Sequence, residues 1–153
     1  MKTRSILLTL ALCFVAALGF AQNPVMGAWK LNEAKSNFPA GAPKNTMVVY
    51  EAVGDKIQCT VDGVEAEGEP THSTWVGKFD GKDYPLTGDP AATTRAYNVV
   101  DDHTLELINK KNGNTGLKAR ITVSPDGKTR TVTVTAVDAS GKKAEYKEVY
   151  DKQ

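Results

Sequence analysis

The chain has 153 residues, 41% of them hydrophobic and 24% charged, and its 19 basic side chains nearly balance its 18 acidic ones. This length fits one domain with a full hydrophobic core, and the balanced charge argues against nucleic-acid binding. Beyond the N-terminal segment no apolar run is long enough to span a membrane as a helix.

The N-terminal segment has the three parts of a signal peptide. Lys2 and Arg4 form a basic start, residues 6–18 form an apolar run, and Gly19-Phe20-Ala21 offers the small residues that a signal peptidase requires. We predict a signal peptide over residues 1–21, which leaves 132 residues for export to the periplasm or the extracellular space. A lipoprotein signal ending at Cys13 is the alternative, but the residue before that cysteine is bulky where a small one is needed.

The rest of the chain alternates β-favouring segments with turn signals at a spacing near a dozen residues. Turn pairs such as Gly54-Asp55 and Asn112-Gly113 suit tight hairpins. The pattern predicts ten strands, at residues 25–31, 46–53, 56–66, 71–79, 82–86, 93–100, 103–111, 115–124, 128–138 and 142–151. Asp62-Gly63 predicts a bulge or an extra turn within the third strand. Residues 32–45 hold two prolines and a glycine, which predicts one helical turn at 33–36 followed by a loop.

Sequential hairpins with short turns indicate one all-β domain over residues 22–153. A meander of eight to ten strands must protect its edges, and closing the sheet on itself removes them. We therefore predict an antiparallel up-and-down β-barrel with little helix beyond the signal peptide. A two-sheet sandwich is the alternative, although uniformly short turns favour hairpins over the long crossings of a Greek key.

The first predicted strand carries Gly27-Ala28-Trp29-Lys30-Leu31, which resembles the opening motif of the lipocalin and fatty-acid-binding proteins, the calycin superfamily. The resemblance implies that Trp29 closes one end of a lipocalin-like barrel and that Gly27 allows a close backbone approach. The chain is also similar to uncharacterised exported bacterial proteins that share Trp-Lys-Leu-Asn, the segment from Gly81 to Gly88, and the segment from Asp126 to Thr129.

Two departures from the fatty-acid-binding branch limit what the resemblance implies. The Pro-rich segment 32–45 cannot supply the two lid helices of that branch. Where that branch has a carboxylate-binding Arg-x-Tyr pair near the C-terminus, this chain has Glu145-Tyr146-Lys147. Fatty-acid binding is therefore not carried over.

A barrel of this size holds one small ligand or is filled by side chains. We expect an apolar or amphipathic ligand, with candidate lining residues Tyr50, Cys59, Trp75, Phe79, Arg95, Tyr97 and Leu107. For Trp75 and Phe79, which share a strand face, core packing is the favoured alternative. Cys59 shares a face with Ile57 and Val61, which favours a buried thiol over a reactive one.

Arg95 and Tyr97 lie two residues apart and therefore share one strand face. If that face is the lumen, Arg95 pairs with a ligand carboxylate and Tyr97 donates a hydrogen bond. If it is the outer face, Arg95 is exposed beside a rim tyrosine. We favour the exposed position because charged side chains are usually solvated.

No pattern predicts catalysis, a cofactor or a metal site. His72 and His103 are the only histidines and lack the neighbouring ligands that a metal site needs, and no nucleophile elbow or phosphate loop occurs. We expect an exported, monomeric small-molecule binding protein that is not an enzyme and binds neither nucleic acid nor metal. The alternative is a packed barrel whose loops bind a partner protein, in an envelope or inhibitor role.

Overall fold

The computed structural model describes residues 23–137 and 140–153, so the predicted signal peptide lies outside the described residues. The ten strands are β1 (Gly27–Leu31), β2 (Lys44–Val53), β3 (Lys56–Val64), β4 (Pro70–Gly77), β5 (Tyr84–Thr87), β6 (Thr94–Asp101), β7 (Thr104–Lys111), β8 (Asn114–Val123), β9 (Thr129–Val137) and β10 (Lys143–Lys152). Each strand pairs antiparallel with its neighbours in the chain, and β1 also pairs with β10. The chain is a closed antiparallel barrel.

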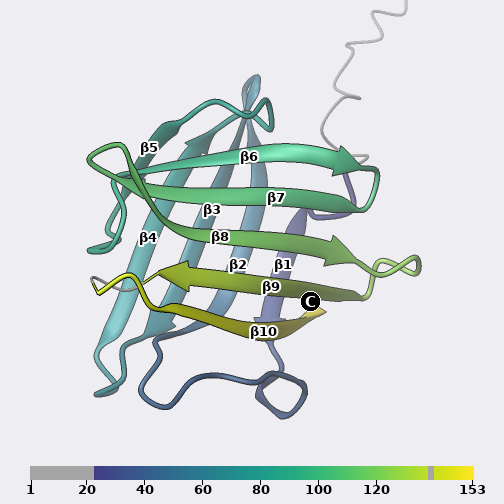
Figure 1. Cartoon of the computed structure of the whole chain (residues 1–153). Helices are drawn as coiled ribbons and strands as arrows, with labels where there is room; N and C mark the ends of the chain where they lie inside the picture. The colour runs from purple at the N-terminus through teal and green to yellow at the C-terminus, as the bar shows by residue number, and fades with distance from the viewer. Residues whose placement is uncertain (1–22, 138–139) are drawn as a thin grey trace, which may run out of the picture.

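The predicted all-β fold class and the up-and-down order of strands are thus confirmed, and the sandwich is excluded. In Figure 1, strands β6 to β10 lie across strands β1 to β5, so the two halves of the barrel cross at a steep angle. The pairing of β1 with β10 closes the barrel and sets Trp29 opposite Lys152. On its other side, Trp29 lies opposite Val48 of β2. Among the described residues, no helix is long and apolar enough to cross a membrane.

Alternation along the strands decides which side chains fill the interior. In β9 the buried side chains are Arg130, Val132 and Val134, whereas Thr133 between the two valines is exposed. Successive residues of a strand point to opposite faces, so the threonines cover the outside and the valines face the lumen. The same geometry turns Arg130 inward.

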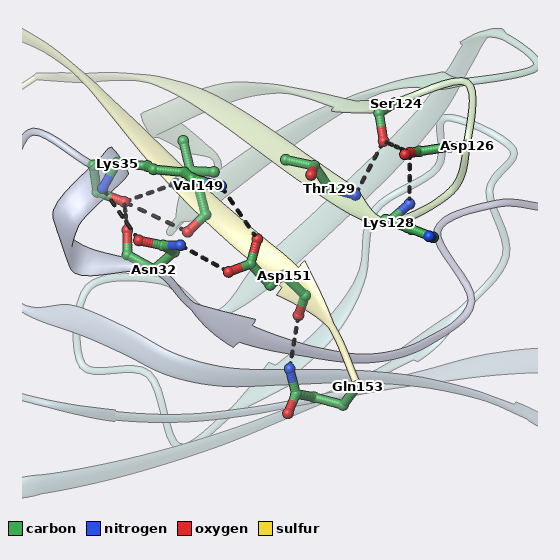
Figure 2. Close-up of polar contacts among 10 residues, drawn as sticks. Asn32, Lys35, Ser124, Asp126, Lys128, Thr129, Val149, Asp151 and Gln153 are labelled. Atoms are coloured by element: carbon green, nitrogen blue, oxygen red, sulfur yellow. Dashed lines mark hydrogen bonds and ion pairs between the residues drawn. The ribbon is translucent and has the colours of Figure 1, made fainter.

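The segment between β1 and β2 starts with the short 3-10 helix η1 (Glu33–Lys35), as predicted for one helical turn. The Asn32 side chain accepts a hydrogen bond from the Lys35 backbone N–H and donates one to Asp151 Oδ2 at 2.7 Å (Figure 2). Ser36 Oγ accepts from the Val149 N–H at 2.8 Å. These bonds hold the start of the connection against β10.

The predicted irregularity at Asp62-Gly63 is a register shift between β2 and β3. Asn45 pairs with Gly63 and Met47 pairs with Asp62, so the extra residue belongs to β2 rather than to β3. A bulge of this kind increases local twist and bends the strand that carries it.

The turn between β8 and β9 is closed by its own side chains. Asp126 Oδ1 accepts from Ser124 Oγ at 2.6 Å and from the Lys128 N–H at 3.0 Å, as Figure 2 shows. Ser124 Oγ in turn accepts from the Thr129 N–H at 3.0 Å. This loop therefore fixes the start of β9, where the Arg130 side chain points into the barrel.

Candidate ligand cavity

The barrel encloses a cavity of about 360 Å³. Exposed residues line it at one end, among them Pro43, Asn45, Ala91 and Val137, so this end opens to solvent. The volume falls within the range of small-molecule sites, which are mostly apolar clefts of roughly 300–1,000 Å³.

Aliphatic residues make up half of the wall. Nine of them come from β2, β3, β7, β8 and β9: Val48, Val61, Leu107, Leu117, Ala119, Ile121, Val132, Val134 and Ala136. An apolar group placed against them would lose its contact with water, which is the main favourable contribution to binding of this kind.

A chain of polar side chains crosses the lumen between these walls. Arg130 Nη2 donates to Tyr50 Oη at 3.1 Å, the hydroxyls of Tyr50 and Tyr97 lie 3.2 Å apart, and Tyr97 Oη lies 3.6 Å from Cys59 Sγ. If the Tyr97 proton goes to Cys59, the Tyr50 proton goes to Tyr97, and every hydroxyl in the chain donates once. The hairpin of β2 and β3 is joined in this way to β6 and β9, which lie far from it in sequence.

Arg95 enters the same chain from the opposite side. Its Nε donates to Asn109 Oδ1 at 2.7 Å and its Nη1 donates to Tyr97 Oη at 3.4 Å. The side chain is 7% exposed and lines the cavity. The exposed position that we favoured from the sequence is therefore wrong, because hydrogen bonds to Asn109 and Tyr97 compensate for the loss of water around the guanidinium.

Arg130 is less well satisfied than Arg95. It is 4% exposed, and its Nε and Nη1 have no hydrogen-bond partner. The guanidinium lies 4.7 Å from the ring centroid of Tyr150 and 5.6 Å from that of Tyr50. The ring faces attract its charge, but they cannot accept hydrogen bonds of full strength.

Glu148 and Tyr150 add a carboxylate and a phenol to the lumen. Tyr150 Oη donates to Glu148 Oε2 at 2.6 Å. Burial raises the pKa of Glu148, although the Tyr150 hydrogen bond and the positive charge of Arg130 oppose this. Burial also raises the pKa of Tyr50, Tyr97 and Tyr150, and raises that of Tyr146 near the mouth to about 12, so these phenols are neutral at pH 7.

Five of the seven predicted lining residues surround the cavity: Tyr50, Cys59, Arg95, Tyr97 and Leu107. Trp75 and Phe79 are not among the lining residues. They stack on each other with ring centroids 6.2 Å apart, and Trp75 packs edge-on against Tyr97 at 4.8 Å. The two rings therefore pack in the core against Tyr97 and do not line the cavity, as expected for core packing.

The residues of the sequence motif lie apart from the cavity. Trp29 is fully buried and donates from Nε1 to the Val25 carbonyl oxygen at 2.7 Å. Lys152 Nζ lies 4.3 Å from the Trp29 ring centroid and also donates to the Met26 carbonyl oxygen. Gly27 has a φ of 101°, and a Cβ there would lie 2.9 Å from Lys152 Nζ. That Trp29 closes the barrel end stays a prediction.

Cys59 is buried, as its position between Ile57 and Val61 predicted. Its side chain faces the cavity and accepts a weak hydrogen bond from Tyr97. The thiol belongs to the polar chain rather than to the outer surface.

Sequence reasoning missed Arg130, Glu148, Tyr150 and Asn109 as lining residues. The signal was present for Arg130, because it continues the inward alternation of Val132 and Val134 by one more step. Glu148 and Tyr150 likewise share one face of β10, although the buried Val149 between them hides the alternation. Alternation shows that these side chains face the lumen only once the inward face of each strand is known.

The two histidines do not join the cavity lining. His72 Nδ1 lies 2.6 Å from Asp62 Oδ1 on the exposed surface between β3 and β4. Among residues 23–137 and 140–153, no group of three or more His, Cys, Asp and Glu side chains is arranged to hold a metal ion.

Comparisons with known proteins identify no family. No protein-family model matches the sequence, and no curated protein matches it. A similar solved structure is that of a redesigned β-barrel, mFAP1, bound to DFHBI, with 15% sequence identity and a TM-score of 0.48. The match covers 86% of this chain and 98% of that one. At this identity and score, the likeness carries no argument about the ligand.

Proposed function

We propose that this chain is an exported protein that binds a small amphipathic molecule inside its barrel. The observation that carries the proposal is the cavity of about 360 Å³, which opens to solvent at one end and whose wall combines aliphatic side chains with hydrogen-bonded polar ones. Sites that bind small molecules combine these features, because the wall supplies affinity and the polar groups supply orientation.

The interior composition favours this function over a packed barrel that binds partners through its loops. In a packed barrel, large side chains would fill the lumen. Here small or slender side chains face it at several points of β8 and β9, among them Ala119, Val132, Val134 and Ala136. The aromatic rings of Trp75 and Phe79 stack on each other and do not line this space.

Export and family membership are parts of the same proposal. The basic, apolar and small-residue parts of residues 1–21 support export. The opening motif from Gly27 to Leu31, together with a closed meander of ten strands, supports a place in the calycin superfamily. Intact-mass measurement of secreted protein tests the first part, and a mature chain beginning at Gln22 is the expected result.

Binding rather than catalysis is proposed because the buried phenols and the buried carboxyl of the lumen hydrogen-bond to other side chains of the wall. Arg130 donates to Tyr50, and Tyr150 donates to Glu148. The apolar part of a ligand would contribute about 25 cal/mol for each Å² removed from water.

Fluorescence titration with N-phenyl-1-naphthylamine, a neutral apolar probe that brightens on leaving water, tests the proposal. Wild-type protein should bind the probe saturably. Ala119→Phe places a ring in the cavity, because Ala119 is buried and lines it, and should weaken binding at least tenfold. Lys118→Phe puts the same ring on the exposed face one residue away and should leave binding unchanged. Equal binding by both variants would place the probe outside the lumen and refute the proposal.

A further inference from the structure

The lumen has an unbalanced charge. The buried residues with charge-bearing side chains that line it are Arg95 and Arg130, each with a guanidinium, and Glu148, with a carboxyl. Arginine stays protonated in proteins, so the two guanidiniums carry two positive charges against at most one negative charge. The remaining ionisable groups of the wall are phenols with raised pKa and the Cys59 thiol, apart from the half-buried Asp89 at the mouth.

The excess charge is centred on Arg130. A guanidinium has five N–H donors, of which Nε carries one and Nη1 carries two. These three have no partner, while Nη2 donates to Tyr50. Among the described residues, no carboxylate oxygen lies within 4.0 Å of a nitrogen of Arg130.

Such an arrangement is costly unless a ligand completes it. Buried polar groups in folded proteins nearly always make hydrogen bonds, and a buried charge is normally paired. Arg95 meets this rule through Asn109 and Tyr97, so the fold is able to satisfy an internal guanidinium. At Arg130 the neighbouring atoms belong largely to the rings of Tyr50 and Tyr150, and three donors remain for another group.

We propose that the molecule bound in the lumen is an amphipathic monoanion, whose oxyanion group, a carboxylate or a sulfonate, accepts hydrogen bonds from Arg130. Charge-assisted hydrogen bonds from a guanidinium to such a group are roughly twice as strong as neutral ones. A single negative charge balances the excess, and the apolar part of the molecule lies against the wall formed by Ile121, Val132 and Val134. This inference rests on the proposed function.

Glu148 limits the affinity for that anion. It shares the lumen with Arg130, and in its ionised form it lowers the positive potential there. An incoming anion therefore meets repulsion from Glu148 as well as attraction from Arg130. Removal of the Glu148 charge should strengthen anion binding, which is the opposite of the effect expected at Arg130.

Two probes that share one ring system separate the contribution of the negative charge to affinity from that of apolar burial. 8-Anilinonaphthalene-1-sulfonate has the ring system of N-phenyl-1-naphthylamine with one sulfonate added. Arg130→Gln should weaken binding of the sulfonate about tenfold or more and change binding of the neutral probe less than threefold. Arg130→Lys should restore part of the difference because it keeps the charge.

The matched control is Arg120→Gln on the neighbouring strand. Arg120 points outward, its side chain is 55% exposed, and it pairs with Glu106. This variant makes the same change in net charge without touching the lumen, so the ratio of the two affinities should not move. A loss of sulfonate binding equal to that of Arg130→Gln would mean that the effect is a general one of net charge, and the proposal would be overturned.

Glu148→Gln keeps the test decisive if Arg130→Gln does not fold. It should strengthen sulfonate binding at least threefold relative to binding of the neutral probe. An unchanged ratio of affinities in both Arg130→Gln and Glu148→Gln would overturn the anion inference while leaving the binding cavity intact. Failure of wild-type protein to bind the neutral probe would instead overturn the proposed function and this inference with it.

Discussion

At the scale of single residues, the Tyr97 hydroxyl is the junction of the polar chain. It receives a hydrogen bond from Arg95, lies 3.2 Å from Tyr50 Oη and reaches Cys59 Sγ. Its position is fully buried. Removing it therefore leaves buried donors on both sides without a partner. The free energy of unfolding then falls by the desolvation cost of these donors, which is larger than the net value of an ordinary hydrogen bond.

Tyr97→Phe should accordingly lower the free energy of unfolding by about 1–3 kcal/mol, measured by urea denaturation. Tyr84→Phe is the matched control. Its hydroxyl donates to Asp80 in an exposed setting, where water replaces the lost partner. That substitution should cost less than about 1 kcal/mol. Equal costs for the two variants would show that the buried chain contributes nothing beyond an ordinary surface contact.

Glu148 makes stability depend on pH in a recognisable direction. Burial raises the pKa of Glu148 in the folded chain, so the folded state keeps this proton to a higher pH than the unfolded state, whose carboxyl titrates near about 4.3. Between these two values the folded state binds more protons, and the contribution of Glu148 to stability falls as pH rises.

Urea denaturation at a series of pH values should show this in wild type and in Glu148→Gln. The difference in free energy of unfolding, wild type minus variant, should decrease as pH rises above about 4 and then level off above the raised pKa. Glu145→Gln, on the exposed face of the same strand, is the control. Parallel curves for wild type and Glu148→Gln would contradict a raised pKa in the folded chain.

The residue scale is also where sequence reasoning was least complete. Tyr50, Cys59, Tyr97 and Leu107 were placed correctly because apolar and amphipathic residues usually face inward. Arg95 was expected outside, because the usual solvation of charge outweighed its alternation with Tyr97. That expectation fails wherever a fold supplies internal partners such as Asn109, and those partners come from strands whose registers the sequence does not specify.

At the scale of secondary-structure elements, glycines set the turns for two different reasons. Gly113 follows Asn112 in the β7–β8 hairpin, and both have positive φ, 80° and 51°, as a two-residue turn of the I′ type requires. Gly88 also has a positive φ, and in addition a Cβ there would collide with the backbone carbonyl oxygen of His72. Gly116 has open space around it and a φ outside the left-handed region.

Alanine substitutions should therefore rank in a definite order by thermal or urea denaturation. Gly113→Ala should cost about 1–2 kcal/mol, the penalty for a left-handed backbone with a Cβ. Gly88→Ala should cost more than that, because the collision with His72 adds to the penalty. Gly116→Ala should change stability by less than about 1 kcal/mol. A Gly88→Ala variant no less stable than Gly113→Ala would rule out the close approach to His72.

Strand positions were the most predictable feature of this scale. All ten strands formed within a few residues of their predicted bounds, because each lies between turn residues with a distinct chemical role. The bulge was the exception. Asp62-Gly63 correctly marked the place along β3 where the pairing is irregular, but the extra residue belongs to the partner strand β2. The pattern of one strand holds no information about which of the two paired strands carries the extra residue.

At the scale of the whole molecule, the requirement to remove sheet edges predicts that the sheet closes into a barrel. It does not predict which residues of β1 and β10 pair to close it. The sequence predicted a meander and hence a barrel. It carried no sign that Trp29 would lie opposite Lys152, since that contact joins residues at the two ends of the described chain. The lumen volume was equally unpredictable, because it depends on the combined register of all the strands.

The ring of strands is not uniformly held together. β8 and β9 share seven residue pairs, whereas β5 shares two with β4, Thr74–Thr87 and Trp75–Leu86, and two with β6. Pro85, in the middle of β5, has no N–H to donate. Local opening is easiest where a ladder is shortest, so the barrel should open first at β5.

Native-state hydrogen exchange measures this directly. The Leu86 amide, bonded to the Thr93 carbonyl oxygen, should exchange at least tenfold faster, after correction for intrinsic rates, than the amides of Ile121 on β8 and Val132 on β9. Equal protection at the three positions would mean that the barrel opens only as a unit. Asp89, Ala91 and Ala92 lie between β5 and β6 and line the cavity. The expected result therefore also places the most readily opened strand next to the end where the cavity opens to solvent.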